Sequence, residues 1–113
     1  MRTTSIGREA EATVSKYLAK NGYKVIDHNW RTRWCEVDII AQKGNILYFI
    51  EVKYRASDSQ GSGFEYIGPN KLKQLAFAAE FWTVQNNWQY DYRLIGAEVS
   101  GINYQVINLV ELS

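Results

Sequence analysis

Two apolar, β-rich segments separated by a short turn signal restrict the fold of this chain more than any other feature. Residues 35–41 read CEVDIIA, residues 45–53 read NILYFIEVK, and Lys43-Gly44 lies between them. Runs of this composition on either side of a glycine-containing turn predict a β-hairpin. With Lys43-Gly44 as the loop, position 38 would lie opposite position 49, and position 36 opposite position 51.

This hairpin carries charged residues in strands that otherwise look buried. Strand alternation places Glu36 and Asp38 on one face of the first strand, and Glu51 and Lys53 on one face of the second. The expected pairing puts all four side chains on the same side of the sheet. Burying such charges costs several kcal/mol unless they are paired or bind something, so the pattern indicates either ion pairs or a binding site.

A helix is predicted over residues 5–21, with Ser5 as its N-cap and Gly22 as its stop. Its apolar stripe is expected to consist of Ile6, Ala10, Val14, Tyr17 and Leu18. Glu11 lies about 80° from the centre of that stripe at about 100° per residue, so it should border the packed face.

The remaining elements follow from composition and periodicity. Residues 23–30 predict a strand, 56–63 a loop, 68–87 a second helix with Pro69 in its first turn, and 89–99 and 102–110 two further strands. The core stripe of the second helix is expected to be Leu72, Leu75, Ala76 and Ala79. The order α-β-β-β-α-β-β predicts one α/β domain over residues 1–113, with a central mixed sheet flanked by helices.

Composition and charge narrow the class of protein. No apolar run approaches the ~20 residues needed to span a bilayer, no signal-peptide pattern opens the chain, and Cys35 is the single cysteine. We therefore expect a soluble, cytoplasmic protein without a membrane partner. Residues 1–33 carry seven Lys or Arg against three Asp or Glu, whereas the remaining residues carry six against nine. A polyanion could dock at the basic front, although a solvated surface explains the same asymmetry.

The charged hairpin can be interpreted as a metal site. Mg²⁺ prefers oxygen ligands and usually takes one or two carboxylates, which Asp38 and Glu51 could supply from neighbouring strands. Lys53, about 6.5 Å further along the strand, could orient a water or stabilise charge on a phosphate. Glu11 could hold the water shell or a second metal. The chemistry indicated is phosphodiester hydrolysis, but each of these charges also fits a plain ion pair.

The same residues resemble a known family. Asp38 followed by Glu51-Val52-Lys53 is similar to the core of the PD-(D/E)XK nuclease superfamily. The longer pattern resembles its YraN-like uncharacterised bacterial branch, relatives of Holliday-junction resolvases. The matching segments are Gly7 with Glu11, Gly22-Tyr23, Asn29-Trp30-Arg31, Cys35 to Ile40, Phe49 to Arg55, Gly61 and Lys71. The resemblance as a whole covers roughly residues 7–98.

The resemblance implies a restriction-endonuclease-like α/β fold and a Mg²⁺ or Mn²⁺ site at Asp38 and Glu51. It also implies that Lys53 is the catalytic lysine and Glu11 the acid carried by the helix.

The sequence departs from the family pattern at two places. Cys35 replaces a family glycine and could narrow the approach to the site. Asp91-Tyr92-Arg93 reverses the family order of Arg-aromatic-Asp, which suggests a rewired ion pair.

Several further residues could contact nucleic acid or support the site. Phosphate contacts are expected from four basic residues, Arg31, Arg33, Arg55 and Lys71. Glu36 would hydrogen-bond a metal ligand or pair with a basic neighbour. Trp30 and Trp34 could stack on unpaired bases, although aromatic residues usually serve the core.

The expected function is a metal-dependent endonuclease acting on DNA, including branched DNA such as Holliday junctions. A homodimer would bring two active sites to one junction. The alternatives are a non-catalytic nucleic-acid-binding module that keeps the nuclease fold, and a protein-interaction role for the Trp and Tyr surface.

Overall fold

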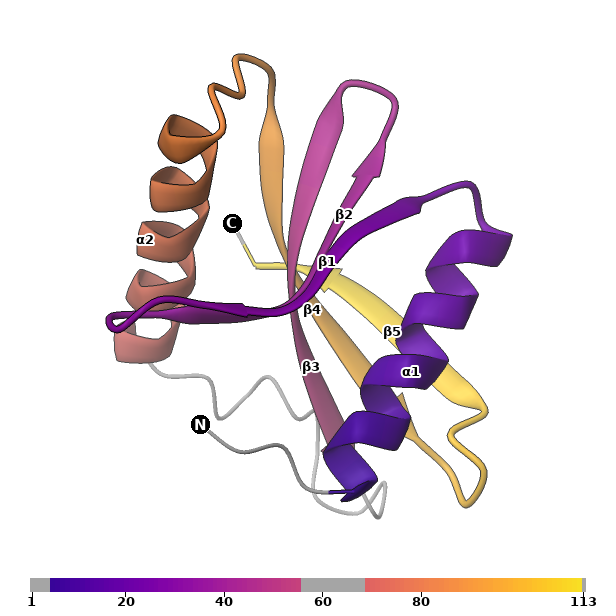
Figure 1. Ribbon diagram of the computed structural model, residues 1–113. Coiled ribbons are helices and arrows are strands. Elements are labelled where there is room, and N and C mark those ends of the chain that lie inside the picture. Colours follow the sequence, from indigo (N-terminus) through magenta and orange to yellow (C-terminus); the bar gives the residue numbers. More distant parts are fainter. Residues whose placement is uncertain (1–4, 56–68, 113) are drawn as a thin grey trace.

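The computed structural model describes residues 5–55 and 69–112, which form a five-stranded mixed sheet between two helices (Figure 1). The predicted loop at residues 56–63, including Gly61, lies outside the described residues. The elements are α1 (Ser5–Lys20), β1 (Lys24–Arg31), β2 (Glu36–Lys43), β3 (Ile46–Arg55), α2 (Pro69–Gln85), β4 (Tyr92–Ser100) and β5 (Val106–Glu111). The predicted α/β order and the mixed sheet flanked by helices are confirmed.

Strands lie in the sheet in the order β1-β2-β3-β4-β5. The β3–β4 pair is parallel, and the other three pairs are antiparallel. A parallel pair needs a crossover connection, and the segment containing α2 provides it. The two helices cover opposite faces of the sheet, as Figure 1 shows with α1 and α2 on either side of β3.

Helix α1 packs on its face through a narrower stripe than periodicity predicted. Ala10, Val14 and Leu18 are fully buried. Ile6 and Tyr17, which were expected in the stripe, are 50% and 38% exposed, so this part of the prediction was wrong. At about 100° per residue, both lie on one edge of the stripe formed by the three buried residues.

Helix α2 covers the other face, and its buried residues are Leu75, Ala78, Ala79 and Thr83. The prediction included Ala76, which is exposed, and missed Ala78 and Thr83. Small side chains give a weak periodic signal, and this explains the error. Among the described helices, neither combines the length and hydrophobicity that crossing a bilayer requires.

The end of α1 follows the predicted glycine stop. Gly22 has φ 89°, a conformation that glycine adopts without strain. The amide of Tyr23 donates to the carbonyl of Leu18 (3.0 Å), and the amide of Gly22 donates to Ala19 (3.4 Å). This is the Schellman pattern, and it directs the chain from α1 into β1.

The β2–β3 hairpin forms, but with a different turn from the one expected. Lys43 pairs with Ile46 and Ile39 with Ile50, so the turn residues are Gly44 and Asn45. Of these two turn residues, only Gly44 has a positive φ (62°), as in a type II′ turn. The predicted register was therefore wrong by two positions. An even shift preserves strand alternation as far as the last paired positions, Ile39 and Ile50. Before them, Val37 packs on the α2 side of the sheet and Ile39 on the α1 side, so the expected alternation of β2 is interrupted at Asp38.

Candidate functional site

Asp38 and Glu51 lie where β2 separates from β3. The paired register between these strands ends at Ile39 and Ile50, so the next opposed positions are 38 and 51. There the backbone amide of Val52 donates to the Asp38 carboxylate (N–Oδ2 2.8 Å) instead of to a carbonyl of β2. Asp38 and Glu51 are each only 8% exposed. The opening of the sheet thus holds two carboxylates in a nearly dry position.

The pKa of Asp38 is raised to about 7, first by burial and then by the charge of Glu51. The hydrogen bond from the Val52 amide opposes this shift, while Glu11 and Glu36 increase it. Burial and like charges both disfavour the ionised carboxylate. Four carboxylates predicted from the sequence therefore act on one another electrostatically, and their combined field favours a bound cation.

Glu11 reaches this cluster from α1 and is 8% exposed, although it was expected only at the border of the packed face. Burial raises its pKa. A hydrogen bond from the Asn29 side chain and the nearby His28 lower it, and Glu36 and Glu51 raise it further. Glu11 is therefore part of the acidic cluster, which consists of Glu11, Glu36, Asp38 and Glu51.

Asn29 is a site residue whose role the sequence interpretation missed. It lies within β1 with φ 49°, in the left-handed region that asparagine tolerates better than most residues. A register irregularity between Val25 and Asp27 precedes it. The available signal was an asparagine inside a strand, where this residue type is depleted. Its side chain supports Glu11 from the neighbouring strand.

This geometry gives a stability prediction for two substitutions at Asn29. Both lose the hydrogen bond to Glu11, but only alanine is strained at positive φ, so Asn29→Ala should be less stable than Asn29→Gly by about 1 kcal/mol. Asn70, in the first turn of α2 and without positive φ, provides a control. There the glycine variant should be the less stable one. Urea denaturation measures both differences, and the same order at both positions would contradict the assignment.

Lys71 connects α2 to the acidic cluster. Its Nζ lies 3.4 Å from Glu51 Oε2, and its side chain is 38% exposed. Lys53 lies two residues after Glu51 on β3 and is exposed. Lys71 therefore neutralises part of the buried acidic charge, whereas Lys53 extends toward solvent along the same strand.

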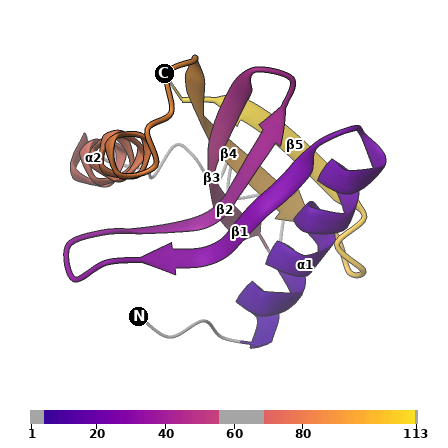
Figure 2. The same ribbon diagram turned by 45° about the horizontal axis from the view of Figure 1, so that its top comes forward.

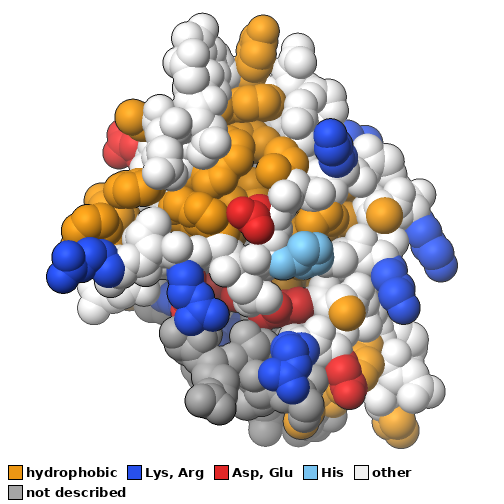
Figure 3. Space-filling view, in the orientation of Figure 1, with side chains coloured by type: hydrophobic (Ala, Val, Ile, Leu, Met, Phe, Trp, Pro, Cys, Tyr) orange, Lys and Arg blue, Asp and Glu red, His pale blue; other side chains and the backbone are white. Residues whose placement is uncertain are grey.

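A surface groove of about 200 Å³ begins beside the cluster. We call it the hairpin groove; it is lined by Arg31, Thr32, Trp34, Cys35 and Glu36 from the β1–β2 hairpin and by Lys71 and Gln74 from α2. Figure 2 shows this hairpin extending from the sheet toward α2. In the space-filling view, Lys or Arg side chains border hydrophobic ones at the hairpin end (Figure 3). The groove combines cations with an aromatic surface next to buried carboxylates.

The other predicted phosphate contacts divide into two groups. Arg31 and Arg33 are exposed on the hairpin. Arg55 instead pairs with Glu98 of β4 (3.4 Å), and the two side chains are only 11% and 12% exposed. A nearly buried ion pair holds Arg55 against the sheet. Arg31 and Arg33 are more exposed and are therefore better placed than Arg55 to contact an external phosphate.

The donor set suits one hard divalent cation bound by two carboxylates. Asp38 and Glu51 face each other across adjacent strands, and Mg²⁺ is commonly held by one or two carboxylates with water completing its shell. The described part of the chain contains no group of three or more His, Cys, Asp or Glu side chains arranged to hold a metal. Glu11 and Glu36 are therefore placed to influence such an ion electrostatically, without closing a three-residue ligand set.

Comparison with known proteins now identifies the family. The family model described as uncharacterised protein family UPF0102 matches residues 10–102. The chain belongs to the UPF0102 family. This is the YraN-like bacterial family that the sequence motifs resemble.

Individual UPF0102 relatives align over much of the chain. A UPF0102 protein of Alkaliphilus metalliredigens is 40% identical over 96 residues, covering 84% of each chain. One from Chlorobium chlorochromatii is 32% identical over 111 residues, covering 98% of this chain and 84% of the relative. One from Anaeromyxobacter dehalogenans is 40% identical over 80 residues, and the match spans only 60% of that relative's length. Because the family is uncharacterised, membership supports the assignment of the fold more strongly than the assignment of a reaction.

Cys35, which replaces the glycine of the family pattern, lies at the tip of the hairpin. Its Sγ is 3.4 Å from Thr32 Oγ1, and it packs partly against the α2 side of the core. The Thr32 hydroxyl also accepts hydrogen bonds from the amides of Trp34 (3.0 Å) and Cys35 (3.3 Å). The cysteine thus lines the hairpin groove within a turn that Thr32 closes.

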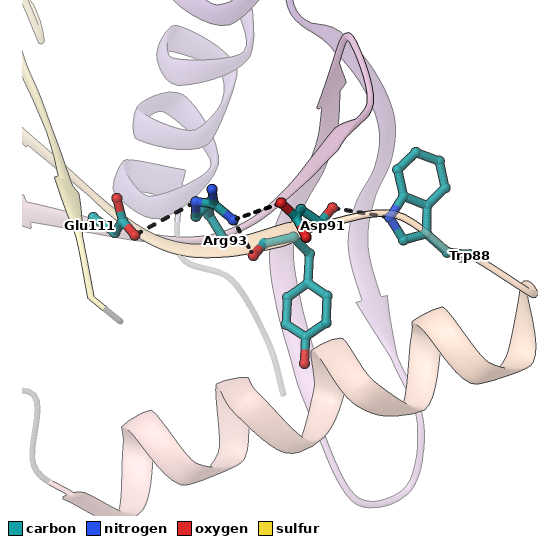
Figure 4. Close-up of polar contacts among 5 residues, drawn as sticks. Trp88, Asp91, Arg93 and Glu111 are labelled. Atoms are coloured by element: carbon teal, nitrogen blue, oxygen red, sulfur yellow. Dashed lines mark hydrogen bonds and ion pairs between the residues drawn. The ribbon is translucent and has the colours of Figure 1, made fainter.

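The reversed Asp91-Tyr92-Arg93 segment forms the ion pair that its composition suggested (Figure 4). Arg93 lies 3.9 Å from Asp91 and 3.7 Å from Glu111 of β5, and Trp88 Nε1 donates to the Asp91 carbonyl. Arg93 pairs with Tyr48 in the β3–β4 register, three positions before Glu51. That separation is about 10 Å along the strand, so the exchange leaves the acidic cluster intact.

Proposed function

We propose that this UPF0102 protein is a metal-dependent endonuclease that hydrolyses DNA phosphodiester bonds, including those of branched DNA such as Holliday junctions. The observation that carries the proposal is the pair of buried carboxylates at the opening between β2 and β3, with the pKa of Asp38 raised to about 7. Two carboxylates that are poorly solvated and repel one another are strongly stabilised in their ionised form by a bound cation.

Each residue has a defined part in the proposed reaction. Asp38 and Glu51 would hold Mg²⁺ or Mn²⁺, which would supply Lewis-acid activation of the phosphodiester and of water. Lys53 would orient the attacking water or stabilise charge on the phosphate oxygens. Lys71, which pairs with Glu51 and remains 38% exposed, would use a second of its three ammonium hydrogens to contact a phosphate.

Glu11 and Glu36 would hydrogen-bond water molecules around the ion, and Asn29 would keep Glu11 oriented. The exposed Arg31 and Arg33 would bind the phosphate backbone outside the reaction centre. Arg55 would support β3 through Glu98 and contribute to the field experienced by the DNA.

A non-catalytic nucleic-acid-binding module is the second candidate. The observation that favours it is the Lys71–Glu51 ion pair, which provides a cation for Glu51 from the protein itself. In that case DNA binding would depend on salt, but neither on divalent metal nor on Asp38.

The experiment is a cleavage assay of the wild-type protein on duplex, single-stranded and four-way-junction DNA. Each substrate is incubated with Mg²⁺, with Mn²⁺ and with EDTA. We expect strand cleavage of at least one substrate with either metal and none with EDTA. Salt-dependent binding without cleavage would support the second candidate, and absence of both cleavage and binding would exclude both.

A further inference from the structure

An exposed aromatic surface adjoins the acidic cluster and is unexplained by phosphodiester chemistry. Trp34 at the tip of the β1–β2 hairpin is 61% exposed, and Phe77 on α2 is 48% exposed. Phe81 lies between them, with ring centroids 6.2 Å from Trp34 and 6.1 Å from Phe77. Trp30 contacts the same Phe81 ring from the inner side, at 6.0 Å. We call Trp34, Phe77 and Phe81 the aromatic platform.

Two cations lie near Trp34 of the platform, one at the hairpin tip and one in the hairpin groove. The Arg33 guanidinium lies 5.5 Å from the centre of the Trp34 ring. Trp34 also lines the hairpin groove together with Lys71, which contacts Glu51. A ligand in the groove could therefore contact the aromatic platform with one end and Lys71 with the other.

We propose that the hairpin groove binds an unpaired nucleotide, with its base stacked on Trp34 and its phosphate toward Lys71. This proposal rests on the proposed function and specifies its substrate as DNA containing an unpaired stretch. A nucleotide combines a flat π-face with an anionic phosphate, which matches an aromatic ring beside lysine and arginine. Bases in an intact duplex are stacked on one another, so this contact selects single-stranded segments and the unpaired parts of branched DNA.

A second copy of the chain fits this surface less well. A two-fold dimer brings the same patch of both subunits together. Such a contact would place the exposed Arg31 and Arg33 of one copy near those of the other, and like charges across an interface are unfavourable. The charge of the groove instead complements a polyanion.

Equilibrium binding measured in EDTA tests this inference separately from cleavage. The probes are a fluorescein-labelled twelve-nucleotide oligo(dT) and a blunt twelve-base-pair duplex, followed by fluorescence anisotropy. We expect the wild type to prefer oligo(dT), and Trp34→Ala to weaken that binding about tenfold to a hundredfold with little effect on the duplex. Trp34→Phe should retain most of the affinity, because the π-face remains.

Tyr90→Ala provides the control, since Tyr90 is 62% exposed and packs on Trp88 outside the groove. Equal binding of oligo(dT) by wild type and Trp34→Ala would overturn the proposal, as would an equal loss in Tyr90→Ala. Light scattering reports the molar mass of each variant. A wild-type dimer that Trp34→Ala dissociates, with oligo(dT) binding unchanged, would assign the platform to self-association instead. A protein that binds oligo(dT) through Trp34 but cuts nothing would refute only the nuclease.

Discussion

Replacing Asp38 with asparagine is expected to stabilise the metal-free protein strongly above pH 7. The folded state raises the pKa of this carboxyl from 3.8 to about 7. Between these values the folded protein holds a proton that the unfolded chain has released, so the free energy of unfolding falls as pH rises from about 4 to about 7. A shift of this size corresponds to roughly 4 kcal/mol at pH 8. Asparagine removes the charge and keeps an oxygen to accept the Val52 amide.

Thermal unfolding in EDTA between pH 5 and pH 8.5 measures this effect. The stability gained by Asp38→Asn should grow by about 2.5 kcal/mol between pH 5 and pH 8, or roughly 10 °C in midpoint, and then level off. Asp91→Asn is the matched control, because its carboxylate is 75% exposed and pairs with Arg93 at the surface. That control should change stability by less than about 1 kcal/mol at any of these pH values. A pH-independent gain for Asp38→Asn would mean that the carboxylate is solvated.

Replacing Glu51 with glutamine is expected to lower the rate of DNA cleavage by about a thousandfold or more. The substitution preserves size but removes one of the two charges proposed to hold the cation, and metal-derived stabilisation is worth several kcal/mol in the transition state. Lys53→Ala should lower the single-turnover rate constant by about a hundredfold to a thousandfold, since it removes one preorganised charge. Single-turnover cleavage with excess enzyme measures both rates.

The controls for these variants separate catalysis from folding and binding. Lys16→Ala removes an exposed lysine of α1 and should leave the cleavage rate unchanged. DNA binding in EDTA should remain within about threefold of wild type for Glu51→Gln, because phosphate contacts from arginine and lysine dominate affinity. If Glu51→Gln cleaves as fast as the wild type, the carboxylate pair has no catalytic part and Glu51 serves only as the partner of Lys71.

The face on which Glu51 lies could be predicted from sequence because strand alternation survives an even register error, whereas the interruption of the alternation of β2 at Asp38 could not. The turn could not be located as reliably, since both Lys43-Gly44 and Gly44-Asn45 are plausible two-residue loops. The predicted element order required only hydrophobic periodicity and turn residues. The α1 stripe was overestimated at Ile6 and Tyr17, because periodicity gives the direction of a side chain and not the width of the surface it meets.

Other features depended on contacts between elements distant in the chain. The left-handed conformation of Asn29 and its hydrogen bond to Glu11 require β1 and α1 to pack together. The Lys71–Glu51 and Arg55–Glu98 pairs join segments across the crossover and cannot be derived from local spacing. Arg55 is an example: it was predicted to contact phosphate, but its ion pair with Glu98 of the neighbouring strand leaves its side chain nearly buried.

The turn at the hairpin tip is held in shape by contacts within the turn itself. Thr32 closes residues 32–35 through its own hydroxyl and through a backbone bond to Cys35 (2.8 Å), so this turn does not rely on the carboxylates for its shape. Loops held in this way tolerate replacement while the scaffold stays intact. Substitutions at positions 33 and 34 are therefore expected to change the surface of the hairpin tip without changing the geometry of the acidic cluster.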